Sequence, residues 1–201
     1  MSWIKTISYE EATGSLKKLY ERVKGPEDKV DNVLRIHSLR PHTLESHMSL
    51  YKSVLHHKDN ALPKWYLETL GIWVSQLNQC NYCVSHHSEG LKRLLKDDEK
   101  YNEIIQYVHH HKVTETLDGK WMAGIEYAKQ LTQDLTNVKQ EAIEKLDKAG
   151  FTDGEVLEIN QLVSYFNYVN RTVIGLGVNT KGDIIGLSPN DNEDPNNWSH
   201  A

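Results

Sequence analysis

Apolar residues recur at spacings of three and four along most of the chain, which is the pattern of amphipathic helices. The first such stripe covers residues 9–23, and a short helix is expected over residues 33–36. Pro41 and Pro63 each stand where a proline fits the first turn of a helix, and apolar stripes follow both of them. No stretch alternates apolar and polar residues as a half-buried strand does. The fold class is therefore predicted to be all-α.

Polar capping residues mark the helix boundaries in the second half of the chain. Asp97 or Asp98 can cap one helix, and Thr136 is expected to cap a later helix that ends at Gly150. Residues 152–155 match a capping box, in which a threonine and a glutamate satisfy each other's backbone N–H groups. This box is expected to open a long, strongly apolar helix.

The chain divides by composition near its end. From about residue 177 onward it becomes polar and rich in Asn, Asp, Gly and Pro. We expect one single-domain helical bundle over residues 1–178. Residues 179–201 are expected to form a polar C-terminal tail, either loosely ordered or draped over a partner subunit.

Composition narrows the possible partners and the location. The chain has 201 residues, a net charge of -5 and an isoelectric point near 6.1, and 38% of its residues are hydrophobic. A basic face for nucleic acid or anionic membrane is not expected at this charge, so no partner of either kind is predicted. The absence of a long apolar run and of a signal-like start predicts a cytoplasmic protein.

Four residues form the candidate chemical site. The two cysteines of the chain, Cys80 and Cys83, would share one face of a helix, and His87 extends the same stripe four residues further on. Glu68 belongs to the preceding helix, which must fold back through the short connection at residues 78–79. Two close cysteines in a reducing compartment indicate redox chemistry or a metal rather than a structural disulfide.

Each of these residue types suits thiol redox chemistry. A thiolate attacks a peroxide or a disulfide, and a second thiol resolves the product into a disulfide. Histidine can take up the thiol proton near neutral pH, and a carboxylate can orient that histidine. The N-terminus of the helix favours a thiolate at Cys80, whereas contact with the imidazole favours Cys83. The sequence leaves open which thiol is the more acidic.

The motif resembles the alkylhydroperoxidase D / carboxymuconolactone decarboxylase family, in its peroxidase-related branch. That pattern is a glutamate, eleven residues, then Cys-x-x-Cys-x-x-x-His, and further stretches that fit the branch are 3–4, 38–41, 150–153 and 166–171. The resemblance implies an all-helical homo-oligomer, a trimer or a hexamer, that reduces hydroperoxides and is recycled by a dithiol or thioredoxin-like reductant. It assigns Cys83 as the attacked thiol, Cys80 as the resolving thiol, and Glu68 and His87 as a proton relay. No cofactor and no metal is expected.

The sequence departs from the better-characterised alkylhydroperoxidases at one position. Those proteins carry a histidine next to the second cysteine, where this chain has Tyr82. A tyrosine of ordinary pKa cannot act as a base at neutral pH. The relay is therefore expected to use Glu68 and His87 alone, or the peroxidase activity to be weaker. His86 is expected off the reactive stripe, as a surface or helix-contact residue.

Three other interpretations of the motif are open. The departure at Tyr82 motivates a disulfide reductase or redox sensor that does not turn over peroxides. Cys80, Cys83, His87 and Glu68 also make a possible set of four zinc ligands. Finally, the cysteines could be two buried helix residues without chemistry.

Overall fold

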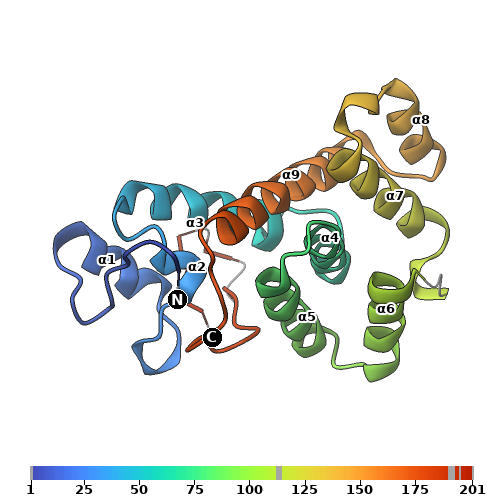
Figure 1. The fold of residues 1–201 in the computed structure, drawn as a ribbon. Helices are drawn as coiled ribbons and strands as arrows, with labels where there is room; N and C mark the ends of the chain where they lie inside the picture. The colour runs from blue at the N-terminus through green and yellow to red at the C-terminus, as the bar shows by residue number, and fades with distance from the viewer. Residues whose placement is uncertain (1, 112–114, 190–192, 195, 201) are drawn as a thin grey trace.

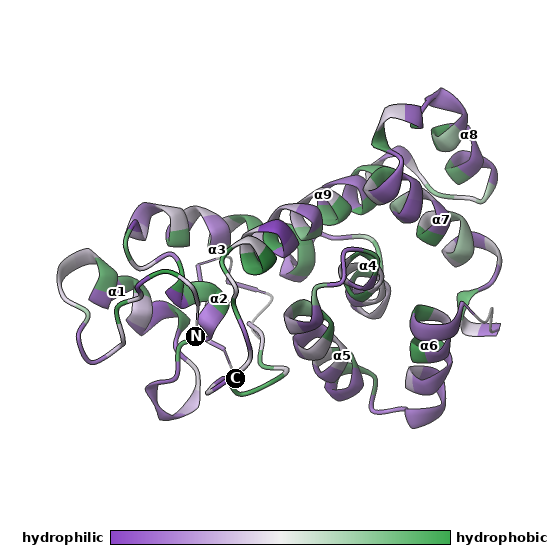
Figure 2. Ribbon diagram, in the orientation of Figure 1, coloured by the Kyte–Doolittle hydropathy of each residue, from purple (hydrophilic) through white to green (hydrophobic). Residues whose placement is uncertain are grey.

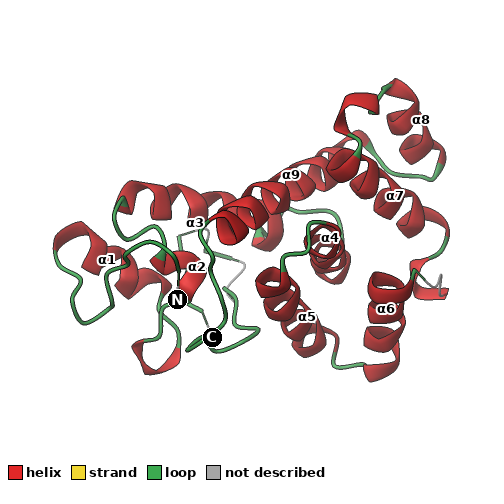
Figure 3. Cartoon of the chain, in the orientation of Figure 1, coloured by secondary structure: helices red, strands yellow, loops and turns green. Residues whose placement is uncertain are grey.

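The computed structural model describes residues 2–111, 115–189, 193–194 and 196–200 of the chain. Across these residues helices follow one another without a named strand, which confirms the all-α fold class (Figure 3). The α-helices are α1 (Gly14–Val23), α2 (Asn32–Arg35), α3 (Pro41–His56), α4 (Lys64–Leu77), α5 (Asn81–Leu95), α6 (Asp98–His110), α7 (Gly119–Gln133), α8 (Gln140–Lys148) and α9 (Asp153–Gly175). Short 3₁₀ turns lie at Pro26–Asp28, Glu115–Leu117 and Leu135–Asn137.

Helix α9 runs through the middle of the molecule and joins its two ends (Figure 1). Helices α1 to α3 lie at one end of it and α4 to α8 at the other (Figure 1). Helix α4 is the central element of the second group, because an unbroken run from Tyr66 to Ser75 is buried. The apolar sides of the helices face one another and the polar sides face outward (Figure 2). Helix α4 and its partners thus hold the start of α5 in a fixed place.

Most helix boundaries lie where the sequence predicted them. Pro41 occupies the first turn of α3, and the side chain of Asp97 accepts a hydrogen bond from the backbone of Lys100 at the start of α6. The capping box of α9 is formed, with both of its hydrogen bonds present. Gly150 has φ +91, the left-handed conformation expected after α8.

Two predicted boundaries are wrong. The first stripe becomes helical only at Gly14, which has φ +58, because residues 9–13 turn back over α1. There the ammonium group of Lys17 lies 3.2 Å from the centre of the Tyr9 ring. Thr136 does not cap α8, since it lies inside a 3₁₀ turn that the Asn137 amide closes by donating to Asp134 Oδ1 over 2.6 Å.

The described residues after Val178 pack against their own chain. The amide of Asn32 donates to the carbonyls of Asn179 and Lys181, at 2.9 and 3.1 Å. Trp198 is buried, and the guanidinium of Arg22 lies 3.7 Å from the centre of its ring. The division into a domain over 1–178 and a tail over 179–201 stays a prediction.

No helix in the described part of the chain has both the length and the apolar character that a membrane crossing requires.

Candidate active site

The two cysteines meet at the turn between α4 and α5. Gln79 adopts φ +58, and the backbone N–H of Cys80 donates to the Ser75 carbonyl over 2.8 Å. This tight turn places Cys80 at the N-cap of α5 and Cys83 in its first turn. Their sulfur atoms lie 2.8 Å apart, both in the free thiol state, with exposed fractions of 1% and 4%. The predicted pairing on one helix face is present.

The hydrogen bond between the sulfurs makes the two thiols unequal. With both thiols protonated, Cys80 donates to the Cys83 sulfur, and once Cys80 ionises Cys83 can donate in return, so the contact lowers the pKa of Cys80. The same hydrogen bond raises the pKa of Cys83 well above its ordinary value, and burial is the next largest cause. Cys80 is therefore the more acidic thiol, in the direction that its place at the helix N-terminus also favours.

Asn170 of α9 supports the charged form of the pair. Its side chain is a hydrogen-bond partner of both thiols and acts to lower the pKa of each. The amide itself is fully buried, donates to Ser75 Oγ over 3.1 Å and accepts from Asn78 over 3.0 Å. The sequence contained Asn170 only as part of a family-like stretch, and nothing in its spacing to the cysteines indicated this contact.

Glu68 and His87 form the acid–imidazole pair that their spacing suggested. His87 Nδ1 lies 2.8 Å from Glu68 Oε2, and the two side chains are 16% and 4% exposed. A carboxylate oxygen only accepts, so Nδ1 carries the hydrogen and Nε2 is left to exchange a proton. The ring is held edge-on by Phe166, with centroids 4.8 Å apart. No hydrogen bond joins His87 to either sulfur, so a proton must pass between them through a bound molecule or water.

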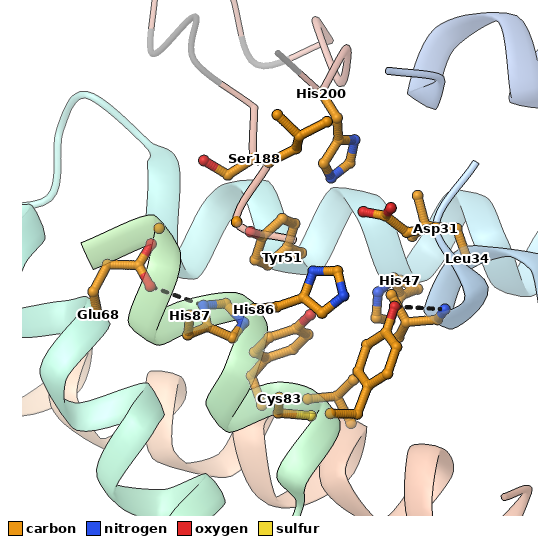
Figure 4. Close-up of a pocket in the computed structure, with 17 residues that line it drawn as sticks. Asp31, Leu34, His47, Tyr51, Glu68, Cys83, His86, His87, Ser188 and His200 are labelled. Atoms are coloured by element: carbon orange, nitrogen blue, oxygen red, sulfur yellow. Dashed lines mark hydrogen bonds and ion pairs between the residues drawn. The ribbon is translucent and has the colours of Figure 1, made fainter. Parts of the chain in front are cut away.

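One pocket brings a thiol and the acid–imidazole pair to the same space, with about 580 Å³ of empty volume, part of it open to solvent (Figure 4). Cys83, Glu68 and His87 line this pocket, whereas Cys80 lies behind Cys83 and outside the lining. Its other walls come from distant parts of the chain. They are Asp31, Val33, Leu34, His47, Tyr51, Tyr82, His86, Gly90, Tyr165, Val169, Gly186, Leu187, Ser188 and His200.

His86 lies off the reactive stripe, as expected, but not at the surface. It is buried, lines the pocket, and stacks on Tyr82 with ring centroids 4.5 Å apart. Its Nε2 lies 3.5 Å from Asp183 Oδ2 and makes no hydrogen bond. The expected surface position is wrong because the helix stripe alone does not show that the C-terminal segment turns this second face of α5 into a pocket wall.

Tyr82 is a structural hydrogen-bond donor. Its hydroxyl donates to Asp183 Oδ2 over 2.6 Å and accepts from the backbone of Val33. Burial, and then the nearby charges of Asp183 and Asp31, raise the pKa of Tyr82 well above its ordinary value. Tyr82 therefore cannot serve as a base at neutral pH, in line with the reasoning from sequence.

Among the described residues, no three His, Cys, Asp or Glu side chains are grouped so that they could hold a metal ion. Glu68 and His87 face each other, and the two sulfurs face each other, as two separate pairs.

Fold and site together define a class: all-helical proteins with a close thiol pair at a helix start and an acid–imidazole pair beside it. Within that class, residues 41–108 match the carboxymuconolactone decarboxylase family, which confirms the resemblance seen in the motif. The matched segment contains both cysteines, Glu68 and His87.

Solved structures share this fold at low sequence identity. The chain is similar to an uncharacterized peroxidase-related protein from Ralstonia eutropha JMP134 with an alkylhydroperoxidase AhpD core, at TM-score 0.73 and 20% identity, covering 89% of this chain and 92% of that one. It is also similar to an uncharacterized peroxidase-related protein from Silicibacter sp. TM1040, at TM-score 0.68 and 22% identity, covering 78% of this chain and 82% of that one. A third similar structure is the debrominase Bmp8 in complex with 2,3,4-tribromopyrrole, at TM-score 0.64 and 13% identity, covering 84% of this chain and 82% of that one. No curated protein matches the sequence.

Proposed function

We propose that the protein is a thiol-dependent hydroperoxide reductase in which Cys83 and Cys80 cycle between two thiols and a disulfide. The observation that carries this proposal is the arrangement of one pocket. Cys83 lines it, Cys80 lies 2.8 Å behind Cys83, and the His87–Glu68 pair lines the same space. An oxidant that enters the pocket meets a sulfur with its resolving partner already in contact.

The first step oxidises Cys83. Cys80, the more acidic thiol, first gives up its proton to solvent. The Cys83 proton then moves along the hydrogen bond to the Cys80 thiolate, and the resulting Cys83 thiolate attacks the terminal oxygen of the hydroperoxide. The O–O bond breaks, the hydroxyl stays on sulfur as a sulfenic acid, and the alkoxide takes a proton from protonated His87 and leaves as an alcohol. Glu68 holds His87 in the orientation for this transfer.

The second step forms the disulfide. The Cys80 thiol attacks the sulfenic acid, an S–S bond forms, and the hydroxyl leaves with the thiol proton as water. An external dithiol then reduces the disulfide by two thiol exchanges and is itself oxidised. His87 regains its proton from solvent, and the cycle closes.

Burial of the sulfurs favours this reaction over disulfide reductase activity. Both cysteines are at most 4% exposed, and the only surface that reaches Cys83 among the described pockets is the one it shares with His87. A hydroperoxide group on a small organic body reaches Cys83 through that space directly, whereas a protein partner reaches the sulfurs only if the pocket opens, which for the reductant must follow oxidation. Fast exchange with protein disulfides and no peroxide turnover would support the disulfide reductase or redox-sensor alternative.

The test is turnover of cumene hydroperoxide with dithiothreitol as the dithiol. Cys83→Ser is expected to abolish turnover. Cys80→Ser is expected to consume a single equivalent of peroxide and to leave a sulfenic acid that dimedone traps. Ser46→Ala, on the exposed side of α3, serves as the matched control. Unchanged turnover in Cys83→Ser, or no turnover by the native protein, contradicts the proposal.

The predicted assembly and location accompany this function. A homo-oligomer, trimer or hexamer, recycled by a dithiol or thioredoxin-like partner, remains a prediction from the resemblance, and the cytoplasmic location remains a prediction from the sequence. Light scattering of the purified chain at micromolar concentration tests the assembly, and a monomer would contradict it.

A further inference from the structure

The end of the pocket away from Glu68 carries a carboxyl group that the peroxidase chemistry does not use. Asp31, just before α2, is 8% exposed, lines the pocket and points into it (Figure 4). Its side chain makes no hydrogen bond or ion pair with any residue that the structure describes. A buried carboxyl without a partner is costly, so this position requires an explanation.

The hydrogen-bond donors near Asp31 are already engaged by another carboxylate. Asp183 accepts from the backbone N–H of Asn32 at 3.2 Å and from the Tyr82 hydroxyl at 2.6 Å. Burial is the main cause that raises the pKa of Asp31 to about 7, and the charge of Asp183 is the second. No cation of the described chain lowers this pKa. Asp183 therefore places a second negative charge near Asp31, while the Asp31 oxygens stay free to accept.

Two of the imidazoles around this end, those of His200 and His47, do not supply positive charge. His200 points into the pocket, and its Nδ1 donates to the Val23 carbonyl over 2.9 Å (Figure 4). Burial lowers the pKa of His200 to about 4 and that of His47 to about 3, so both rings are neutral at physiological pH. His86 presents a buried Nε2 without a hydrogen bond. This end thus presents the Asp31 oxygens beside neutral rings, and no described lysine or arginine lines the pocket to pair with them.

Part of the pocket wall is aromatic. Tyr51 and Tyr165 both line the pocket and stack on each other, with ring centroids 5.7 Å apart. Aromatic faces attract organic cations, and a carboxylate anchors an ammonium group by charge-assisted hydrogen bonds. The body of such a ligand would lie along these rings toward the thiol end.

We propose that the Asp31 end of the pocket is a binding site for the primary ammonium group of a small organic amine. The ammonium binds the Asp31 carboxylate, His86 and His200 contribute ring contacts, and the apolar body points toward Cys83. The amine site deepens the proposed function, because it names the class of molecule that the pocket accepts. It rests on the proposed function only in that both use the same pocket.

Three probes with the same aromatic body test the proposal: benzylamine, benzyl alcohol and benzoate. Calorimetry on the reduced full chain is expected to show benzylamine binding at least about tenfold more tightly than benzyl alcohol, the factor expected for a hydrogen bond to a charged group. Benzoate is not expected to bind. Asp31→Asn is expected to weaken benzylamine at least about tenfold and to leave benzyl alcohol unchanged. Asp59→Asn, an exposed aspartate, is the matched control.

A second measurement remains decisive if Asp31→Asn fails to fold. Benzylamine binding by the native chain is expected to release protons near pH 7, because the ligand ionises Asp31, and calorimetry in buffers of different ionisation enthalpy measures that release. Equal binding of benzylamine and benzoate, no binding of benzylamine, or native affinity in Asp31→Asn would overturn the proposal. The readout is binding, so an inactive peroxidase with normal benzylamine affinity would refute only the proposed function.

Discussion

Replacing Asp31 by asparagine is expected to stabilise the protein at neutral and alkaline pH. The pKa of Asp31 is raised from its ordinary value of 3.8 to about 7, chiefly by burial. The folded chain therefore keeps the Asp31 proton between these two values while the unfolded chain has lost it. Stability falls as pH rises through this window, by up to about 4 kcal/mol if the whole difference is realised. Asparagine is neutral throughout and removes that loss.

Urea unfolding of the reduced protein at several pH values between 4 and 9 measures this effect. The difference in unfolding free energy between Asp31→Asn and the native chain is expected to rise from pH 4 to pH 7 and to level off above it, because Asp31 in the native chain is then ionised in both states. Asp59→Asn, on the surface, is expected to follow the native profile. A difference that does not change with pH would refute the reasoning, since it would mean that Asp31 ionises normally in the folded chain.

Three further substitutions test the site and its support. Glu68→Gln keeps a side chain of the same size but not the charge that orients His87, and peroxide turnover is expected to fall by about 100-fold while the fold persists by circular dichroism. Asn170→Ala removes the amide that favours both thiolates, so the absorbance of the thiolate at about 240 nm is expected to rise only at higher pH than in the native chain. An unchanged titration would remove Asn170 from the site. Gly71→Ala directs a methyl group into the Phe166 ring, since a Cβ there would overlap the ring carbons, and is expected to cost about 1–3 kcal/mol in urea unfolding. Gly154→Ala, where a Cβ meets only Thr152 Oγ1 at 3.9 Å, is its control.

The helical fold and the thiol end of the pocket could be predicted because their signals are local. Apolar spacing, capping residues and Pro41 are read within a few residues of the elements they define. Cys80, Cys83 and His87 belong to one helix start, and Glu68 reaches them through a connection of a few residues. Helical geometry brings the sulfurs together, and the tight turn between α4 and α5 places the acid near the imidazole.

The other residues of the site could not be predicted because long-range packing places them. Asn170 contacts the thiols only because α9 packs on α4, and no spacing in the sequence encodes that contact. His86 was expected to be peripheral because a helix stripe shows which residues share a face and not what covers the next face. The polar composition after residue 177 likewise concealed the role of that segment, which supplies His200 to the pocket and Asp183 to Tyr82.

The two ends of the pocket therefore differ in how they can vary. Both thiols, Glu68 and His87 lie within residues 41–108, the part that matches the family, and their geometry depends on the turn between two adjacent helices. Asp31 and His200 lie outside that part, in segments that meet only in the folded chain. Substitutions at the Asp31 end can thus change which molecule is bound without moving the sulfurs or the acid–imidazole pair. For this reason the family match bears on the chemistry at Cys83, whereas the substrate must be inferred from residues that the match does not include.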